Sequence, residues 1–255
     1  MPALTPWEMA GVFGAGAFAG TVNTVVGAGS LLTFPALIAM GYSPLVANVT
    51  NTVGVVPGAI SGAYGYRREL AGQGGRLRRL APVSVAGGVV GAGLLLILPG
   101  ASFERVVPYL IVLACVLVIA QPRLSARMRR REGANETHSQ LGFDVGMFAT
   151  AVYGGYFGAA QGVMFIALLS IFIDDHLQRL NAAKNVVAAI VNGVAAILFM
   201  VFAPIAWLPA GLLAAGSTIG GQIGSRAGRR LPPTLLRVLI VVSGLAVAIK
   251  LVVSP

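Results

Sequence analysis

Polar side chains interrupt two uncharged stretches of the chain at places rich in glycine. An amide or hydroxyl in hydrocarbon costs free energy unless it is paired, and three such groups lie beside expected helix breaks. Glycine neighbours let a ligand approach the backbone closely, although close helix packing explains most individual glycines as well. The candidate ligand-binding residues at the two breaks are Asn23, Gly27, Gly29, Ser30, Gln161 and Gly162.

Lys184 is a further candidate because it stands alone before a long uncharged stretch. The 41 residues from 185 to 225 carry no charge, and Lys184 lies about one turn into a helix expected over 181–203. A lysine inside a membrane costs about 2.5–3.5 kcal/mol on insertion scales and is a functional candidate by default. The alternative is a snorkelling lysine whose ammonium reaches the interface. Both interpretations stay open, and as a binding residue Lys184 would attract an anion.

Half-helices that end inside the membrane would add to this positive potential. A helix N-terminus offers free N–H groups and a partial charge of roughly +0.5, which suits anions. Two broken hairpins that enter from opposite faces would aim such termini at one point. An internal repeat with a spacing of 134 relates Asn51 to Asn185, so we expect these two amides to face each other across a pseudo-two-fold axis.

The chain lacks the residue patterns of an enzyme or a metal protein. No nucleophile–base constellation and no metal-ligand spacing occurs, and Cys115 is the single cysteine. One cysteine gives neither a disulfide framework nor a thiolate metal site. His138 and His176 are expected in loops without other ligands nearby. We therefore expect no enzymatic activity, no cofactor and no metal centre.

The composition is that of a membrane protein. Of the 255 residues, 56% are hydrophobic and 10% are charged, and the mean hydropathy is +0.84. A soluble domain has about 25% charged residues. Charged side chains are absent from 9–66, 80–103, 145–173 and 185–225, and a membrane-spanning helix needs about 20 apolar residues. The predicted fold class is all-α, a polytopic integral membrane protein.

Basic residues gather in short segments between the apolar runs. Five arginines lie in 67–79, five in 122–140 and three in 226–233. The positive-inside rule explains this distribution, so the net charge of +10 does not indicate nucleic-acid binding. We expect these segments on the cytoplasmic side of the inner (cytoplasmic) membrane.

An internal duplication divides the chain. The pattern S-x-x-G-G-x-x-G occurs at 84–91 and again at 217–224, at a spacing of 133. We expect a first transmembrane repeat over 1–121, a cytoplasmic linker over 122–140 and a second transmembrane repeat over 141–255.

The loop charges reverse between the two repeats, which indicates inverted topology. The segment 67–79 is basic and 99–105 is nearly neutral, whereas 204–207 is uncharged and 226–233 is basic. Inverted repeats are a common transporter architecture. Both termini are then outside, and the 29 uncharged residues over 145–173 must cross an even number of times, although they are too few for two spans of about 20 residues.

Each repeat is therefore expected to hold a broken, re-entrant helical hairpin followed by three spanning helices. The hairpins cover 9–40, broken near Gly27 to Ser30, and 143–173, broken near Gly154 to Gly162. Asp174, Asp175 and Arg179 are expected at the solvated exit of the second hairpin, with a role in proton coupling as the alternative. The expected spanning helices are 44–65, 80–98, 106–121, 181–203, 207–225 and 235–253.

The segment 20–35, with A-N-V-T-N after it at 47–51, resembles the TauE/SafE family, also called the sulfite exporter or toluene-sulfonate uptake permease family. The family pattern is a glycine-rich first segment with a G-G-G-like turn and a proline, then A-x-x-T-N at the start of the next helix. Here the turn reads G-A-G-S at 27–30, one glycine short, and the second copy is more degenerate. The resemblance covers nearly the whole chain, and it adds Thr50 and Asn51 to the candidate site, with Lys184 and Asn185 in the second copy.

The resemblance implies a secondary transporter for a small sulfur-containing anion, such as sulfite, a sulfonate or sulfoacetate. This anion would bind near the membrane midplane between the repeats, with proton coupling and direction left open. The alternative is a non-transporting membrane scaffold or a chaperone-like partner in cofactor or metal insertion. Lys184 and polar groups at two symmetric breaks favour transport, because a scaffold needs neither. The expected partners are the anion and the lipid bilayer, with a homodimer left open.

Overall fold

The computed structural model describes residues 4–129, 140–227 and 233–253, and these residues are almost entirely helical. This confirms the all-α class. The described helices are α1 (Pro6–Val25), α2 (Ser30–Ala39), α3 (Pro44–Gly65), α4 (Gly74–Ile97), α5 (Gly100–Arg129), α6 (Gln140–Tyr156), α7 (Gln161–Phe172), α8 (Leu177–Phe202), α9 (Trp207–Ala227) and α10 (Pro233–Val253).

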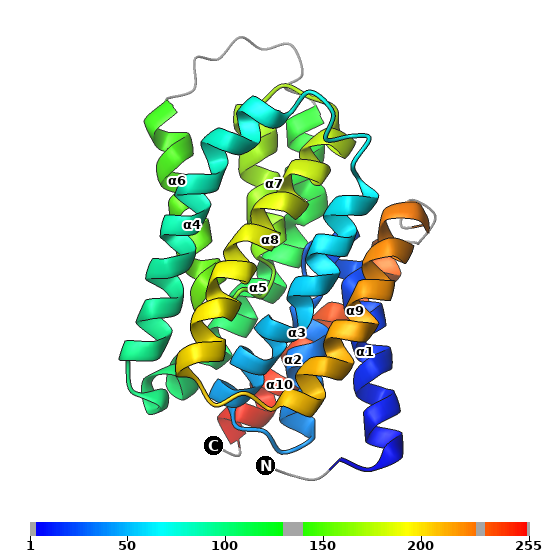
Figure 1. The fold of residues 1–255 in the computed structure, drawn as a ribbon, viewed down its shortest axis with the longest axis vertical. Coiled ribbons are helices and arrows are strands. Elements are labelled where there is room, and N and C mark those ends of the chain that lie inside the picture. Colours follow the sequence, from blue (N-terminus) through cyan, green and yellow to red (C-terminus); the bar gives the residue numbers. More distant parts are fainter. Residues whose placement is uncertain (1–3, 130–139, 228–232, 254–255) are drawn as a thin grey trace.

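The helices run up and down the long axis of an elongated molecule (Figure 1). The beginning of α1 and the end of α10 lie at one end, which we call the terminal end. The end of α5 and the beginning of α6 lie at the opposite end, which we call the linker end (Figure 1). The expected cytoplasmic linker lies partly outside the described residues, since 130–139 are not described.

Three of the described helices are long and apolar enough to cross a membrane: α4, α5 as far as Pro122, and α8. The exposed faces of the outer helices are apolar too. On α10, for example, Val242 and Ile249 are each more than 60% exposed. Large exposed apolar surface on a folded chain indicates contact with lipid or a partner.

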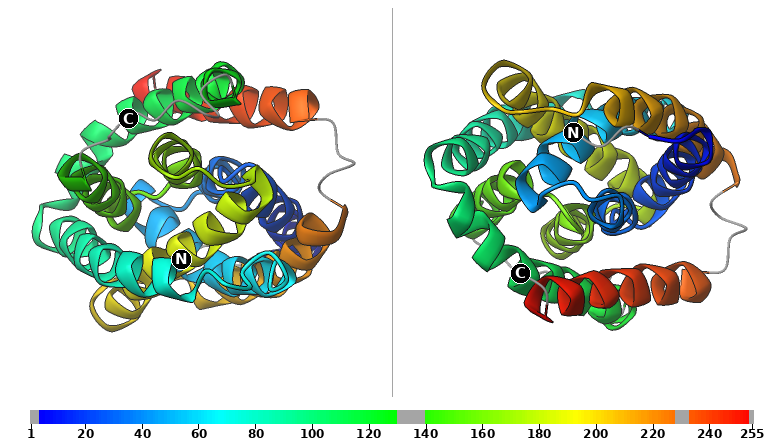
Figure 2. Two further views of the ribbon diagram at one scale, coloured as in Figure 1. Left: turned by 90° about the horizontal axis from the view of Figure 1, so that it is seen from above. Right: turned by 90° about the horizontal axis from the view of Figure 1, so that it is seen from below.

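Two short helices, α2 and α7, lie inside the helix bundle (Figure 2). The α5 and α10 helices pack together on one side of them, whereas α4 and α9 lie on the opposite side (Figure 2). The α2 helix packs against α10 and α3, and α7 packs against α5 and α8. Each half of the chain therefore places one short helix in the middle.

Each short helix forms a hairpin with the helix before it, at the predicted breaks. The α1–α2 hairpin enters from the terminal end and the α6–α7 hairpin from the linker end (Figure 1). A capping box at Thr5 and Glu8 starts α1. At the breaks, Gly27 has φ +89° and Gly158 has φ +75°, a left-handed conformation that glycine adopts without strain.

The S-x-x-G-G-x-x-G segments hold these hairpins by close packing. The α4 helix packs along α6, and α9 packs along α1. A Cβ atom at Gly91 would lie 2.1 Å from the carbonyl oxygen of Val152, and one at Gly220 would lie 2.0 Å from that of Ala17. Only glycine permits these approaches, so the motif serves helix packing rather than ligand binding.

Several helix boundaries differ from the sequence-based expectation. The loop expected over 67–79 is shorter, because α4 begins at Gly74 and carries Arg76 and Arg79 on its first turns. The α5 helix continues past Pro122 to Arg129, where the linker was expected. Proline removes one backbone hydrogen bond, but the polar residues after it still extend the helix beyond the apolar span.

Corresponding helices of the two halves begin at a constant spacing. This spacing is 133 for α3 and α8, for α4 and α9, and for α5 and α10, the same as for the glycine motif. It pairs Asn48 with Asn181 and Asn51 with Lys184. The spacing of 134 that related Asn51 to Asn185 does not fit these helices.

Candidate functional site

The two helix breaks touch each other. The backbone N–H of Gly162 donates to the carbonyl oxygen of Gly27 at 3.2 Å. A Cβ atom at Gly27 would lie 2.6 Å from the Cα of Gly162, and the reverse distance would be 2.5 Å. The turns therefore meet backbone to backbone, which explains why both positions are glycine.

Lys184 reaches the carbonyl end of α1. Its Nζ donates to the carbonyl oxygens of Asn23 at 3.1 Å and Thr24 at 3.2 Å, and the residue is only 1% exposed. A snorkelling lysine would extend to the surface, so that alternative is wrong. The ammonium instead neutralises the negative end of the α1 dipole. It has three N–H donors, of which these carbonyls take two.

Two asparagines of α8 support the same carbonyl end. The Nδ2 atoms of Asn181 and Asn185 each donate to the carbonyl oxygen of Thr24 at 3.2 Å. The sequence identified Asn185 but missed Asn181. A polar residue one turn before Lys184 was the available signal, because i and i+3 share a helix face.

Thr50 and Asn51 hold α3 to its neighbours instead of facing Asn185. The Thr50 hydroxyl accepts a hydrogen bond from the backbone N–H of Ala206 at 3.1 Å, which ties α3 to the α8–α9 loop. The Thr33 hydroxyl of α2 donates to Oδ1 of Asn51. The expectation that Asn51 and Asn185 face each other is thus not met, because Asn51 bonds α2 and Asn185 bonds α1, the two helices of the same hairpin.

Gln161 begins α7 and binds an asparagine of α8. Its Nε2 donates to Oδ1 of Asn192 at 2.6 Å, and its own Oε1 is buried without a hydrogen-bond partner. Asn48 on α3 is similar. Its Nδ2 donates to the carbonyl oxygen of Tyr156 at 3.0 Å, and its Oδ1 is buried and unpaired. Asn48 and Asn192 were missed from the sequence.

The first break offers free hydrogen-bond donors. Among the described residues, the backbone N–H groups of Ala28, Gly29 and Ser30 have no acceptor. The side chains of Asn23 and Ser30 are half-buried and also make no hydrogen bond within this part of the chain. Gly29 is needed for packing as well, since a Cβ there would lie 2.2 Å from the carbonyl oxygen of Ala19. Free N–H groups at a helix N-terminus suit an anion.

Comparison with known sequences gives a family match over most of the chain. The sequence profile of the family described as "Sulfite exporter TauE/SafE" matches residues 12–251. The chain belongs to the TauE/SafE family. No solved structure matches it.

Curated relatives of this TauE/SafE protein are similar over nearly their whole length. The "Probable membrane transporter protein YfcA" of Escherichia coli K12 is 25% identical, over 97% of this chain and 91% of its own length. The "Probable membrane transporter protein ORF9" of a Sinorhizobium species is 27% identical, over 97% and 93%. A "Probable membrane transporter protein" of Haemophilus influenzae is 25% identical, over 94% and 93%. The chain is thus a multi-pass membrane protein of a transporter family, not an enzyme.

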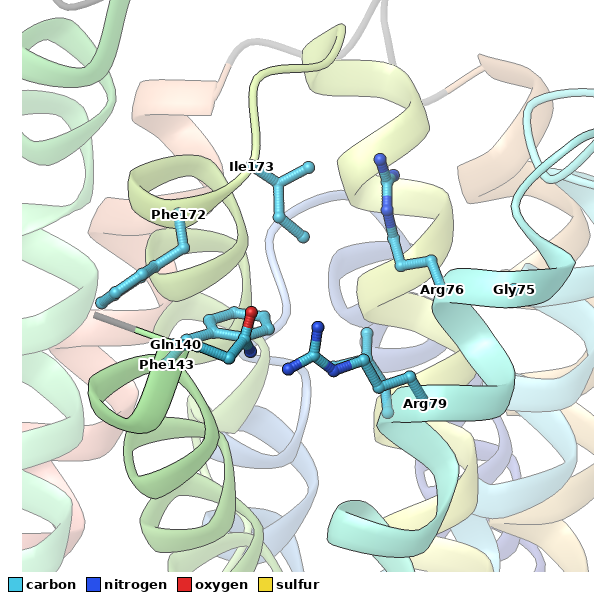
Figure 3. A pocket seen from close by; sticks show the side chains of 8 residues that line it. Gly75, Arg76, Arg79, Gln140, Phe143, Phe172 and Ile173 are labelled. Atoms are coloured by element: carbon cyan, nitrogen blue, oxygen red, sulfur yellow. The ribbon is translucent and has the colours of Figure 1, made fainter. Parts of the chain in front are cut away.

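A separate cavity of about 420 Å³ opens at the linker end of this TauE/SafE protein. Arg79 of α4 points across it toward Gln140 and Phe143 of α6 (Figure 3). Phe172 and Ile173, at the end of α7, border the other side (Figure 3). None of the residues predicted to bind the ligand lines this cavity.

An ion-pair network lies beside the cavity and ties α4 to α8. Asp175 accepts hydrogen bonds from Arg76 at 2.9 Å and from Arg179 at 2.9 Å. Burial raises the pKa of Asp175, but the hydrogen bonds from both arginines outweigh it and hold the pKa below the usual range. Gln73 extends the network by donating to the carbonyl oxygen of Arg179 at 2.9 Å. The sequence predicted a solvated hairpin exit here, with proton coupling as the alternative, and did not predict the ion pair between Arg76 and Asp175.

Proposed function

We propose that this protein is a secondary transporter for a small sulfur-containing anion, such as sulfite, a sulfonate or sulfoacetate. The observation that carries the proposal is the contact of the two helix breaks at Gly27 and Gly162, beside unpaired N–H groups. Family membership supports the substrate class, because the matching family is described as a sulfite exporter. The anion binds where the breaks meet.

The anion is held by donors from the first break and from α8. Backbone N–H groups of Ala28, Gly29 and Ser30 take its oxygens, and the side chains of Asn23 and Ser30 add polar contacts. Lys184 supplies the positive charge of its ammonium and the third N–H of that group. In the low dielectric of a membrane protein interior, one such charge attracts an anion far more strongly than it would in water.

We propose that the chain consists of inverted repeats over 1–121 and 141–255, joined by a cytoplasmic linker over 122–140, in the inner membrane. Three observations support this. Corresponding helices begin 133 residues apart. The α1 helix packs along α9 as α6 packs along α4. The hairpins enter from opposite ends (Figure 1). Rocking of such repeats around a central site gives alternating access.

The alternative function, a scaffold or chaperone-like partner, has less support. A scaffold requires neither a fully buried lysine nor unpaired donors at a helix break. The relatives from Escherichia coli, Sinorhizobium and Haemophilus influenzae are all named as probable membrane transporters.

Transport by purified protein in proteoliposomes tests the proposal. Labelled sulfite and labelled sulfoacetate are each offered to vesicles preloaded with the same unlabelled anion, since counterflow reports exchange in either orientation. We expect exchange of at least one anion above that of protein-free vesicles, and a proton gradient imposed in parallel assays tests coupling. Exchange equal to protein-free vesicles for sulfite, sulfoacetate and simple sulfonates would contradict the substrate class.

A further inference from the structure

The carbonyl ends of α1 and α6 are equivalent in geometry but not in charge. The hairpin turns correspond at a spacing of 131, which relates Gly27 to Gly158 and the first residues of α2 and α7. The carbonyl oxygen of Val22 accepts hydrogen bonds from the N–H groups four and five residues later in the chain. The carbonyl oxygen of Tyr153 accepts the same pair of hydrogen bonds. The last turns of the two helices are thus built alike.

At the end of α1, the two carbonyls that follow that of Val22 accept hydrogen bonds from the ammonium of a lysine. They belong to Asn23 and Thr24, and both accept from the ammonium of Lys184. The amide of Asn181 adds a further donor to Thr24. This end of the helix dipole is therefore neutralised by a charge that the chain itself supplies.

At the end of α6, the corresponding carbonyls receive no hydrogen bond from any described residue. They belong to Gly154 and Gly155, and within the described part of the chain neither accepts a hydrogen bond. Asn48, the counterpart of Asn181, donates to Tyr156. Asn51 stands where α8 has Lys184, and it carries no charge.

Side-chain oxygens at the same turn are unpaired as well. Oδ1 of Asn48 and Oε1 of Gln161 are buried without a partner, in residues that are 1% and 3% exposed. The Asn48 amide is oriented by its bond to Tyr156. Oε1 of Gln161 approaches the last turn so closely that a Cβ at Gly154 would lie 1.9 Å from it. An unpaired buried acceptor in a native fold requires an explanation, and a bound water or ion is one.

We propose that the carbonyl end of α6 binds a monovalent alkali cation, Na⁺ or K⁺. Its ligands are Oδ1 of Asn48, Oε1 of Gln161 and the carbonyl oxygens of Gly154 and Gly155. All four are neutral oxygens, which suit an alkali cation at a half-helix C-terminus. A divalent cation prefers carboxylates, and amides do not take up a proton at neutral pH. The ion replaces the ammonium that Lys184 provides at the other hairpin.

A cation bound at this site would be the coupling ion of the proposed transporter, and this coupling role rests on the proposed function. An anion at the first break and a cation at the second would lie on either side of the contact between Gly27 and Gly162. The binding of the cation alone does not depend on transport, so it can be tested without any substrate.

The test is the thermal unfolding midpoint, Tm, of the purified full chain in detergent without substrate. Sodium or potassium chloride replaces choline chloride at constant ionic strength. Ligand binding raises Tm, and we expect a rise of about 2–4 °C at roughly five times Kd for one alkali cation. A Tm equal in all three salts overturns the proposal whatever the transport assays show. A larger rise in one salt identifies the preferred ion.

Variants at equivalent positions locate the site. Asn48→Ala removes a ligand and should abolish the cation-dependent rise, whereas the matched variant Asn181→Ala, at the α1 end, should retain it. Loss of the rise in both variants, or in neither, would contradict the assignment. Asn51→Lys places an ammonium at the position equivalent to Lys184, so its Tm should no longer depend on the cation even where Asn48→Ala fails to fold. A full cation-dependent rise in Asn51→Lys would also contradict it.

Discussion

Lys184 has a structural role in addition to the two alternatives that the sequence offered, anion binding and snorkelling. Its ammonium lies on two carbonyls at the end of α1, which offsets part of the cost of a buried charge. One N–H remains for a ligand. A residue that both stabilises a half-helix and faces the substrate would make binding depend on the hairpin being correctly formed.

Replacing Lys184 should therefore affect both stability and affinity. In Lys184→Ala, loss of a charged hydrogen bond should weaken anion binding by about 1.5–3 kcal/mol, roughly tenfold or more. Lys184→Arg keeps the charge but should be only partly tolerated, because the guanidinium is larger and planar. The measurement is substrate affinity of purified wild type and variants. Equal affinities in wild type and Lys184→Ala would leave anion recognition to Asn23, Ser30 and the backbone N–H groups.

The polar residues of the site differ in how far the sequence reveals them. Lys184 stands out because 41 uncharged residues follow it, and Gln161 stands out because its neighbours are small or apolar. Asn48 and Asn192 also lie in uncharged runs, but neither adjoins an expected helix break or a lysine in the sequence. Their importance comes from contacts with residues more than 30 positions away, Tyr156 and Gln161 respectively. Such long-range pairs follow from helix packing, which a single sequence does not specify.

At the scale of elements, the hairpins depend on close backbone approaches. The position of the breaks was predictable, because glycine and small polar residues favour an interrupted helix. The sequence predicted that the N-termini of the two half-helices point at one place, but it did not predict that the two breaks touch. The direct contact of Gly27 with Gly162 depends on how the two hairpins pack against each other, which a single sequence does not specify.

A large side chain at the first break should stop transport. Gly29→Leu places a Cβ 2.2 Å from the carbonyl oxygen of Ala19, which must push α2 away from α1 and displace the N–H groups of the break. We expect transport to be lost while some folded protein remains in the membrane. Gly14→Leu is the matched control on α1, because a Cβ there meets nothing within 4 Å. Wild-type exchange by Gly29→Leu in the proteoliposome assay would show that the break does not form the binding site.

The ion-pair network around Asp175 at the linker end should make the stability of the protein depend on pH only at acidic pH. The pKa of Asp175 is lowered in the folded protein, so its stabilisation is present above the ordinary aspartate pKa of about 4 and is lost as pH falls through the lower folded value. Asp175→Asn should lower stability by roughly 1 kcal/mol at neutral pH. The Tm difference between wild type and Asp175→Asn should be constant from pH 5 to 8 and shrink below about pH 4. A difference that already shrinks between pH 7 and 5 would contradict the assignment.

At the scale of the whole molecule, composition and charge-free runs correctly predicted an all-α membrane protein. These features depend on the bilayer, which imposes its thickness and polarity on any chain that crosses it. The ends of the helices were less predictable. Arg76 and Arg79 were expected in a loop, but arginine is a good helix former, and pairing with Asp175 and Asp144 favours their place on α4.

The proposed inverted arrangement of the two halves predicts which loops lie on which side of the membrane. The α3 helix begins at the terminal end and α8 begins at the linker end (Figure 1). If the halves are inverted repeats, the loops that precede these two helices face opposite sides of the membrane. The basic residues of 67–79 then place the linker end in the cytoplasm.

Cysteine accessibility measures this directly in a background with Cys115→Ala. Ser43→Cys precedes α3 and His176→Cys precedes α8, at the constant spacing of 133. Ala71→Cys and Pro204→Cys form a second pair of equivalent positions in the α3–α4 and α8–α9 loops. In intact cells, a membrane-impermeant thiol reagent should label Ser43→Cys and Pro204→Cys, while Ala71→Cys and His176→Cys should react only after permeabilisation. Labelling of both members of a pair from the same side would mean that the halves are not inverted, and the anion would then have no pseudo-two-fold axis on which to bind.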